Sequence, residues 1–507
     1  MFYTFRKSRC LINGFLTDEF DIERGVRQGC PLSMLLFIIS QDPLYTAIDN
    51  SSLVKPFKTP NSDIKLQGYA DDTNFILSDE QSIKEAFKIV KMFESATAAS
   101  LNLDKTKIFG IGSWKRKVTW PITNVHINSE SMSILGIKYS NNFLDSIDLC
   151  WSDVNDRILN KVHSLNNRKL TLFQRSVIVN GLLASQIWYH GQTYPLPIKW
   201  SKKINVHLFK FIWISKVEPI ARSTLNLDRI EGGLSVLNIL VKSECLFACR
   251  MLKQFLECED QLSLIAYYNA IRLNPLVNIN SLPRNVSFTS TPYFDKAIST
   301  IRNLSKINGF PNISSKVAYK HLSKNLAPKI QAKYPLHNWE CIWKNLNFKY
   351  IPVNTREIIF KYIHEILPNK HRLKQIRRST SDLCESCNRP ETNIHMVYHC
   401  KNVEFAKIFL YNMLAHCCIG DYNLLKLFFL DISKRENKKT NTVVLLITLY
   451  ISSVWYGRAN KTQIVNIYIS TILNHLRLLK MLLGNSLHKL FTQEFCNLNQ
   501  ESLSRYL

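Results

Sequence analysis

Two adjacent aspartates, Asp71 and Asp72, stand between two short apolar runs and are well suited to phosphoryl-transfer chemistry. If the flanking runs pair as a hairpin, the turn projects both carboxylates beyond the end of the strands, which hold them in place. Such carboxylates can bind two Mg²⁺ ions about 3.5 to 4 Å apart, which activate an attacking hydroxyl and stabilise the leaving pyrophosphate. Taken alone, an Asp-Asp pair is more often a solvated turn that caps the next helix.

A second set of residues has the spacing of metal ligands. The pattern C-x2-C-x7-H-x4-C is formed by Cys384, Cys387, His395 and Cys400. The two-residue gap places two thiolates on one turn, and the later histidine and cysteine can complete a tetrahedron around Zn²⁺. His399 is an alternative ligand, although His395 leaves a better loop to Cys400. The competing interpretation is a group of buried cysteines beside a surface histidine.

A basic run precedes this cluster and consists of Lys370, His371, Arg372, Lys374, Arg377 and Arg378. Such a run can contact nucleic-acid phosphates, or it can be the solvated face of a helix, and both interpretations stay open. The whole chain has 65 Lys and Arg against 39 Asp and Glu, a formal charge of +26, which favours a polyanionic partner. Trp339, Trp343 and Tyr362 have helical spacing, which favours core packing over base stacking.

The aspartates belong to the second of four motifs that follow one another along the chain. These motifs are residues 24–33 (RGVRQGCPLS), 69–72 (YADD), 100–107 (SLNLDKTK) and 134–137 (ILGI). This order and spacing resemble the reverse transcriptases of non-LTR retrotransposons, of the LINE type and jockey-like. Residues 170–175 and 232–234 resemble the thumb and post-thumb region of these elements. The segment from 339 through the Cys and His cluster resembles the zinc-binding region that follows many of these polymerases. The likeness therefore covers most of the chain, less specifically after residue 150.

The resemblance implies RNA-directed DNA polymerisation primed at nicked target DNA, with the element's RNA as template, deoxynucleotides as substrates and Mg²⁺ at Asp71 and Asp72. Lys105 would protonate the pyrophosphate or offset its charge, and the second role is favoured. The matching contacts to nucleic acid or nucleotide are Arg27, Gln28, Gly29 and Tyr69. A glycine lets backbone approach a strand closely, and a glutamine can bond a base or sugar edge. A nuclear location is expected from the resemblance.

The strand with the family's first metal-binding aspartate has no counterpart in this sequence. In the family this strand lies some tens of residues before the segment that matches 24–33, whereas only 23 residues precede Arg24 here. Asp18 and Asp21 match the stretch directly before Arg24 and are not assigned to that role. The chain is therefore expected to be an amino-terminally truncated gene product or gene model with an incomplete two-metal site. The alternative function is a retrotransposon remnant that binds nucleic acid without catalysis.

Local patterns predict the elements that position these residues. Residues 66–68 and 73–77 predict a hairpin with the aspartates at its tip, and residues 78–80 predict the start of an amphipathic helix over 81–99. Runs at 108–111 and 133–139 predict further strands. Met34 stands where the family usually has proline, so the start of that helix is expected to differ slightly.

These patterns indicate an α+β chain in four parts: a partial right-hand polymerase fingers and palm with an antiparallel sheet over 1–145, a helical thumb and post-thumb region over 146–277, a connector rich in Ser, Asn and Pro over 278–335, and a mostly helical domain with a zinc knuckle over 336–507. In the thumb, one helical face is predicted to hold Trp151, Ile158, Val162 and Leu165.

Composition narrows the class of protein. A chain of 507 residues with 46% hydrophobic residues can build several cores. Thirteen scattered cysteines indicate reduced, buried thiols, and the adjacent Cys417 and Cys418 are expected in a core. The amino terminus lacks the order of a signal peptide. The apolar stretch 443–456 is shorter than the roughly 20 residues that cross a bilayer, so a buried helix and no membrane partner are expected. The oligomeric state is not indicated.

Overall fold

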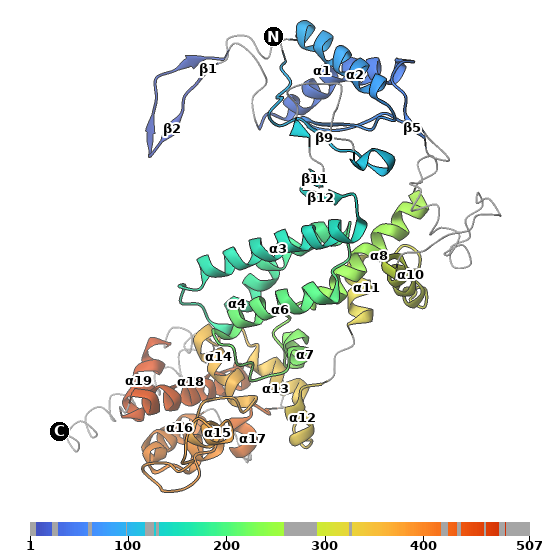
Figure 1. Cartoon of the computed structure of the whole chain (residues 1–507). Helices are drawn as coiled ribbons and strands as arrows, with labels where there is room; N and C mark the ends of the chain where they lie inside the picture. The colour runs from blue at the N-terminus through green and yellow to red at the C-terminus, as the bar shows by residue number, and fades with distance from the viewer. Residues whose placement is uncertain are drawn as a thin grey trace. The chain divides into compact units, whose positions relative to one another are not determined.

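The computed structural model of the chain describes residues 7–22, 29–58, 63–97, 99–116, 126–127, 131–257, 292–323, 327–416, 424–432, 438–460, 463–475 and 482. The chain divides into two compact units. The first comprises residues 1–153, 192–195 and 246–314, and the second comprises 154–191, 196–245 and 315–507. Figure 1 shows many helices together with short paired strands, which agrees with the predicted α+β class. The four-part division proposed above stays a prediction.

The first unit contains the strands and the two helices that pack with them. Its strands are β1 (Lys7–Ser8), β2 (Leu11–Ile12), β3 (Phe15–Leu16), β4 (Phe20–Asp21), β5 (Phe57–Lys58), β6 (Asp63–Ile64), β7 (Leu66–Tyr69), β8 (Asp72–Phe75), β9 (Lys107–Ile108), β10 (His126–Ile127), β11 (Ser131–Ile134) and β12 (Ile137–Ser140). Its helices are α1 (Pro31–Asn50), α2 (Glu80–Thr97), the 3-10 helix η1 (Gly112–Arg116) and α10 (Pro292–Leu304), and it shares α3 (Phe143–Leu165) and α8 (Ile239–Glu257) with the second unit. Every strand pair is antiparallel except β9 with β10, which is parallel.

The predicted hairpin and the helix after it are confirmed. β7 pairs with β8, and a core packs α1, α2 and this hairpin together, with Leu44, Ile48 and Val90 among its buried residues. The α2 helix begins where Asp79 Oδ1 accepts a hydrogen bond of 2.8 Å from the backbone N–H of Ser82. Hydrogen bonds from Ser82 and the ammonium of Lys55 lower the pKa of Asp79 to about 2, so this cap stays ionised.

The single strand predicted over 133–139 is wrong. The chain reverses there, and β11 and β12 form an antiparallel hairpin closed by Leu135 and Gly136. Both turn residues have positive φ, 48° and 78°, as a tight two-residue hairpin turn with the twist of the strands requires. Leucine rarely adopts this conformation, which is why the sequence did not reveal the turn. The helix after the first motif starts at Pro31, in the first position that suits proline.

The second unit is helical. Its elements are α4 (Leu172–Ile178), the π-helix η2 (Val179–Leu183), α5 (Ser185–Gly191), α6 (Ile198–Trp213), α7 (Arg222–Asn226), the 3-10 helix η3 (Arg229–Glu231), α11 (Ser315–Leu322), α12 (Lys329–Lys333), α13 (Trp339–Leu346), α14 (Val353–Ile363), α15 (Lys370–Gln375), the π-helix η4 (His395–His399), the 3-10 helix η5 (Lys401–Val403), α16 (Glu404–His416), α17 (Leu424–Phe428), α18 (Lys438–Asn460) and α19 (Ile464–Asn474). Contacts join α4 to α6, α14 to α18, and α16 to both α18 and α19.

The structure bears on two stretches that the sequence analysis singled out, the face of α3 and residues 278–335. The face predicted on α3 is confirmed, because Trp151, Ile158, Val162 and Leu165 are all buried. The described part of residues 278–335, the predicted connector, contains α10, α11 and α12. Apolar residues at helical spacing explain α10, since Ile298, Ile301 and Leu304 are buried.

The apolar stretch around residues 443–456 belongs to a longer helix than the sequence suggested. Residues 440–458 of α18 are long and apolar enough to cross a membrane, yet 78% of that window is buried inside the protein. Figure 1 shows α18 among α14, α16 and α19. The burial is that of a core helix, as predicted.

One buried cation in the second unit has a structural role. Arg175, 2% exposed, donates to the carbonyls of Leu170, Arg168 and Phe211, at 3.1, 3.2 and 2.9 Å. Replacing Arg175 by alanine leaves these carbonyls unsatisfied, and we expect the free energy of unfolding to fall by about 3 kcal/mol. Thermal unfolding measures the effect, with Arg168→Ala at an exposed position as the control. Equal melting temperatures for the two variants would contradict this role.

Candidate functional site

The aspartate turn lies at the tip of the β7–β8 hairpin. Tyr69 pairs with Asp72, so Ala70 and Asp71 form the turn, and Ala70 has φ of 52°, an uncommon value for a residue other than glycine. Both aspartates are exposed. The arrangement projects the two carboxylates into solvent from a rigid hairpin, which is what metal-assisted phosphoryl transfer needs.

Helix α1 braces this hairpin through Tyr45. The Tyr45 hydroxyl lies 3.0 Å from Oγ1 of Thr73 on β8. On β7, a Cβ added to Gly68 would stand 2.2 Å from that hydroxyl, so only glycine admits the ring. The contact fixes α1 against both strands just behind the aspartates.

Of the other residues predicted to take part in polymerisation, the structure places only Tyr69 directly beside the aspartate turn. Tyr69 is 67% exposed beside the turn, and Gly29 has φ of 86° two residues before α1. Arg27 and Gln28 lie outside the described residues. Lys105 is exposed in a turn after α2, and the described structure shows no hydrogen bond or ion pair between it and either aspartate. The role of Lys105 therefore stays a prediction.

The four predicted zinc ligands do lie together, and no other group of three or more such residues stands within ligand distance in the part of the chain that the structure describes. Their ligand atoms are all within 4.8 Å of one another. Cys400 Sγ is 3.8 Å from Cys384 Sγ and 3.7 Å from Cys387 Sγ. A tetrahedral ion with bonds of about 2.3 Å to sulfur requires sulfur atoms about 3.8 Å apart, and both distances to Cys400 Sγ match this spacing.

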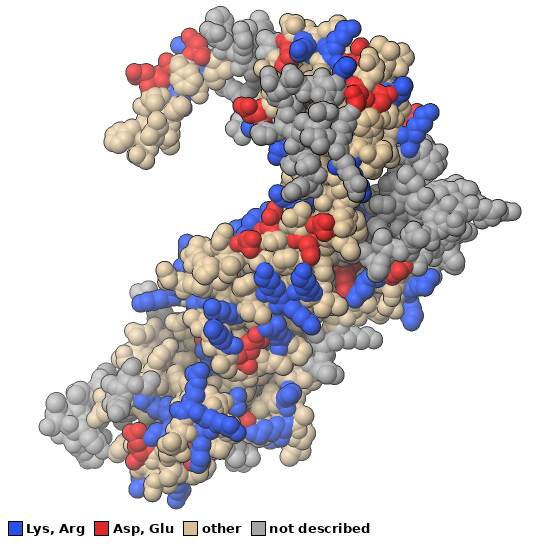
Figure 2. Space-filling model, in the orientation of Figure 1, with Lys and Arg blue, Asp and Glu red and all other residues tan. Residues whose placement is uncertain are grey.

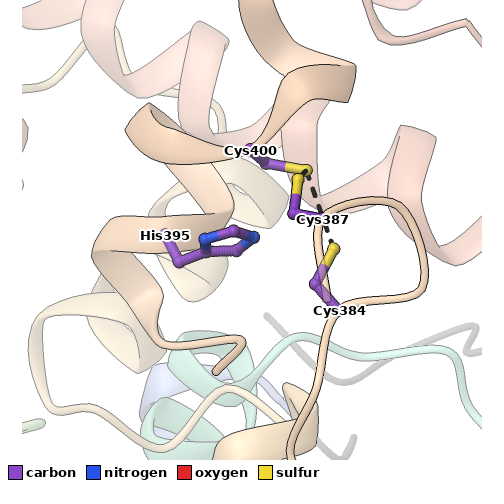
Figure 3. Close-up of side chains that lie close together, drawn as sticks. All are labelled: Cys384, Cys387, His395 and Cys400. Atoms are coloured by element: carbon purple, nitrogen blue, oxygen red, sulfur yellow. Dashed lines mark hydrogen bonds between the residues drawn. The ribbon is translucent and has the colours of Figure 1, made fainter. Parts of the chain in front are cut away.

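His395 completes this arrangement and is favoured over His399. Figure 3 shows its ring directed toward the three sulfur atoms. Its Nε2 is buried and has no hydrogen-bond partner among the described residues, as expected of an atom that is reserved for a metal. Burial lowers the pKa of His395, which favours the neutral ring that binds zinc.

The local backbone explains how Cys384 and Cys387 come to one point. The Cys384 N–H donates to the carbonyl of Arg389 at 2.8 Å, and the Asn388 N–H donates back to the carbonyl of Cys384 at 2.9 Å. Asn388 has φ of 53°, a conformation that asparagine tolerates. This closed turn, the knuckle, brings the two thiols to one point, as the predicted zinc site requires.

The thiols differ in how easily they ionise without a metal. Burial raises the pKa of Cys387, but the hydrogen bond from the Lys401 N–H, at 3.2 Å, and the hydrogen bonds with the other two thiols lower it by more, so the net shift is downward. Burial holds the pKa of Cys400 well above its usual range. A divalent cation would overcome that burial penalty, because it supplies the opposite charge that the buried thiolates otherwise lack.

Glu391, between Cys387 and His395, connects the knuckle to its surroundings and was missed by the sequence analysis. Its carboxylate accepts a hydrogen bond of 2.6 Å from Arg458 of α18 and one of 2.8 Å from the backbone N–H of Lys370 in α15. The Tyr450 hydroxyl of α18 donates to the carbonyl of Val397 at 2.7 Å. The knuckle, α15 and the core helix α18 are therefore tied together.

The basic run before the knuckle is not one helix face. α15 ends at Gln375, and Arg377 and Arg378 follow in a turn in which Arg377 has φ of 57°. Within α15, Lys370 pairs with Glu385 at 2.8 Å and Lys374 pairs with Asp382 at 2.7 Å. These two lysines fasten α15 to the knuckle. Trp343 and Tyr362 are buried, which confirms their predicted place in the core.

Comparison with known proteins gives two findings. Residues 2–139 match the family described as reverse transcriptase (RNA-dependent DNA polymerase). A transposon TX1 protein of 149 kDa from Xenopus laevis, described as uncharacterized, is 26% identical over 247 residues. The aligned segment covers 46% of this chain and 18% of that relative, so the chain spans a minor part of the relative's length.

Proposed function

We propose that this chain, a retrotransposon protein whose residues 2–139 form reverse transcriptase sequence, is part of the RNA-directed DNA polymerase of a non-LTR retrotransposon. The single observation that carries the proposal is the braced hairpin with Asp71 and Asp72 exposed at its tip, inside the matched segment. In this proposal both carboxylates bind Mg²⁺, the element's RNA is the template and nicked target DNA is the primer.

Further roles in this proposal rest on the family pattern. Lys105 offsets the charge of the leaving pyrophosphate, and Arg27, Gln28, Gly29 and Tyr69 contact template or nucleotide. The helical second unit supplies the thumb and a structural zinc site at the knuckle. The proposed use of nicked target DNA as a primer implies that the protein acts in the nucleus.

We also propose that residues 1–507 alone do not form a complete polymerase palm. The first half of α1 exposes a row of apolar side chains that includes Met34, Leu35, Ile38 and Ile39, each more than half exposed. Apolar surface of this extent on one helix is normally covered by another part of the protein. The position of this surface beside the aspartate hairpin, which α1 braces, supports a palm that is completed by a further segment with the first catalytic aspartate.

A nucleic-acid-binding protein without catalysis is the second candidate, and the charge distribution of the second unit favours it. Figure 2 shows Lys and Arg side chains gathered over α6 and again near α14 and α15 on the visible face. On α6, which contains no acidic residue, the exposed lysines are Lys199, Lys202, Lys203 and Lys210. A surface of this kind suits the phosphates of RNA or DNA.

We expect the chain to bind RNA and DNA with an affinity that falls about a thousandfold between roughly 50 and 200 mM salt, because about six phosphate contacts release their counterions. Replacing Lys202, Lys203 and Lys210 by glutamine should weaken binding and reduce the slope of log K against log salt by about two to three. Mobility shifts or fluorescence anisotropy across a salt series measure both effects.

The control is a second triple variant that loses the same three positive charges at lysines outside α6. Lys84, Lys88 and Lys91 on α2 are replaced by glutamine, and this variant should keep the salt slope of the unmodified chain. Absence of binding at low salt would refute the nucleic-acid function. Equal slopes for both triple variants would show that α6 is a solvated surface.

A further inference from the structure

A cavity of about 570 Å³ in the second unit belongs neither to the aspartate hairpin nor to the zinc knuckle. Its wall comes from α12, the end of α14, α15 and residues 392–394, which lead into the knuckle. Sites for small ligands usually have volumes of about 300 to 1,000 Å³ and combine apolar rings with a few polar groups. The cavity meets both conditions.

Basic side chains outnumber acidic ones on this wall. Lys329, Lys333 and Arg372 line the cavity, and Glu365 is its one carboxylate among the described lining residues. Lys333 forms an ion pair with Glu365, and the Tyr334 hydroxyl donates to the same carboxylate at 2.6 Å. The acid is therefore neutralised within the wall. Lys329 and Arg372 remain as an excess of positive charge, which favours an anionic ligand.

Aromatic side chains form another part of the wall. The rings of Tyr334 and Phe429 have centroids 5.2 Å apart, and the half-buried Tyr334 lines the cavity. Tyr362 is buried in the wall, and its hydroxyl has no hydrogen-bond partner among the described residues. Burial raises the pKa of Tyr362, so the hydroxyl stays protonated. A ring, an excess of cations and an unsatisfied hydroxyl suit a ligand with a planar group and a phosphate.

Positive charge continues along the end of α15 and the turn that follows it. A second hollow, open to solvent, is lined by Lys374, Arg377, Arg378, Ser379 and Thr380. Arg377 and Arg378 form no ion pair with any described acidic residue. The same short helix therefore borders a basic surface for a strand's phosphates and a cavity that can receive one of its nucleotides.

We propose that this cavity binds one unpaired nucleotide of a nucleic-acid strand, with the base against Tyr334 and the phosphate near Lys329 and Arg372. The inference rests on the proposed function, since nucleic-acid binding brings a strand to α15. Stacking on an aromatic ring accepts any base, so the site distinguishes unpaired from paired strands and does not read sequence. A free nucleotide has the same chemistry, and the test separates it from a strand.

The test uses the full, zinc-loaded chain and fluorescence anisotropy with two labelled RNA probes of equal length, a blunt duplex and a duplex with a single-stranded overhang. Tyr334→Ala should weaken binding to the overhang probe about tenfold, because a stacking partner is lost. Arg372→Gln should have a similar selective effect, because a phosphate contact is lost. Tyr334→Phe keeps the ring and should bind the overhang like the unmodified chain. Tyr456→Ala on α18 is the matched control outside the cavity.

Four results would overturn the proposal. Equal losses on both probes would mean that Tyr334→Ala disturbs the fold or that Tyr334 does not distinguish unpaired from paired strands, and zinc content and melting temperature would identify a disturbed fold. Unchanged binding to the overhang probe would remove the site, while salt-sensitive duplex binding would leave the proposed function standing. Displacement of the overhang probe by micromolar adenosine monophosphate would reassign the cavity to free nucleotides. If the unmodified chain bound neither probe, both proposals would fail together.

Discussion

Replacing Cys384 and Cys387 by serine is expected to remove the zinc ion from the chain and to loosen the region around the knuckle. The unmodified chain should hold one Zn²⁺, because Cys400 Sγ already stands at tetrahedral spacing from the other two sulfur atoms and His395 Nε2 faces them without a partner. Structural zinc sites contribute an apparent binding free energy of about 10 to 16 kcal/mol. Four protein ligands leave no position for water, so the ion has no hydrolytic role.

The loss should spread along contacts that the knuckle makes. Glu391, Lys370 and Lys374 fasten α15 to the knuckle and to α18, so the turn with Arg377 and Arg378 should lose protection from hydrogen exchange when the metal is removed. Metal analysis and thermal unfolding with and without a chelator measure both effects. A double variant with Cys10→Ser and Cys249→Ser, two thiols outside the cluster, is the control. Equal zinc content in the two double variants, or none in the unmodified chain, would show that the four residues only pack.

Local signals in the sequence were enough for part of the fold. Asp79 before an amphipathic segment predicted the start of α2, and two β-rich runs around the aspartates predicted the hairpin, because each depends on neighbouring residues alone. The turn at Leu135 and Gly136 was missed, since leucine gives no sign of positive φ. The α10 helix was missed because the Ser and Pro content of its surroundings outweighed the spacing of Ile298, Ile301 and Leu304.

The zinc cluster and the cavity beside α15 also differ in how far local sequence could predict them. The zinc ligands lie within 17 consecutive residues, so their spacing was sufficient to predict the cluster that the structure shows. The cavity beside α15 takes its wall from residues between 219 and 429, which only the packing of α7, α12, α14 and α15 brings together. No local pattern can signal such a site. Glu391 was overlooked for a related reason, since its partner Arg458 is 67 residues away.

The geometry of the aspartate hairpin bears on whether the chain can polymerise DNA, and an activity assay can test this. Asp71 and Asp72 are exposed at a turn, and no third acidic, His or Cys side chain of the described residues stands within ligand distance of them. Two metal ions about 3.5 to 4 Å apart need carboxylates on more than one strand to fix both. The exposed apolar face of α1 is a separate observation that supports the proposed further segment.

A polypeptide of residues 1–507 is therefore expected to extend no primer on an RNA template with Mg²⁺ or Mn²⁺. In a longer protein that adds an aspartate-bearing strand, primer extension should appear, and Asp71→Ala should then lower it by at least about a thousandfold because the transition-state charge is no longer balanced. The affinity of the Asp71→Ala variant for RNA should stay within about twofold of that of the unmodified protein, because the turn is distant in sequence from the basic α6. The hairpin itself should persist, since the contact between Tyr45 and the strands at Gly68 and Thr73 does not involve position 71. Asp63→Ala, at an exposed acid on β6, is the control for the loss of one negative charge in the same unit. Template-dependent synthesis by residues 1–507 alone that disappears with Asp71→Ala would mean that the two aspartates suffice, and it would overturn the proposal of an incomplete palm.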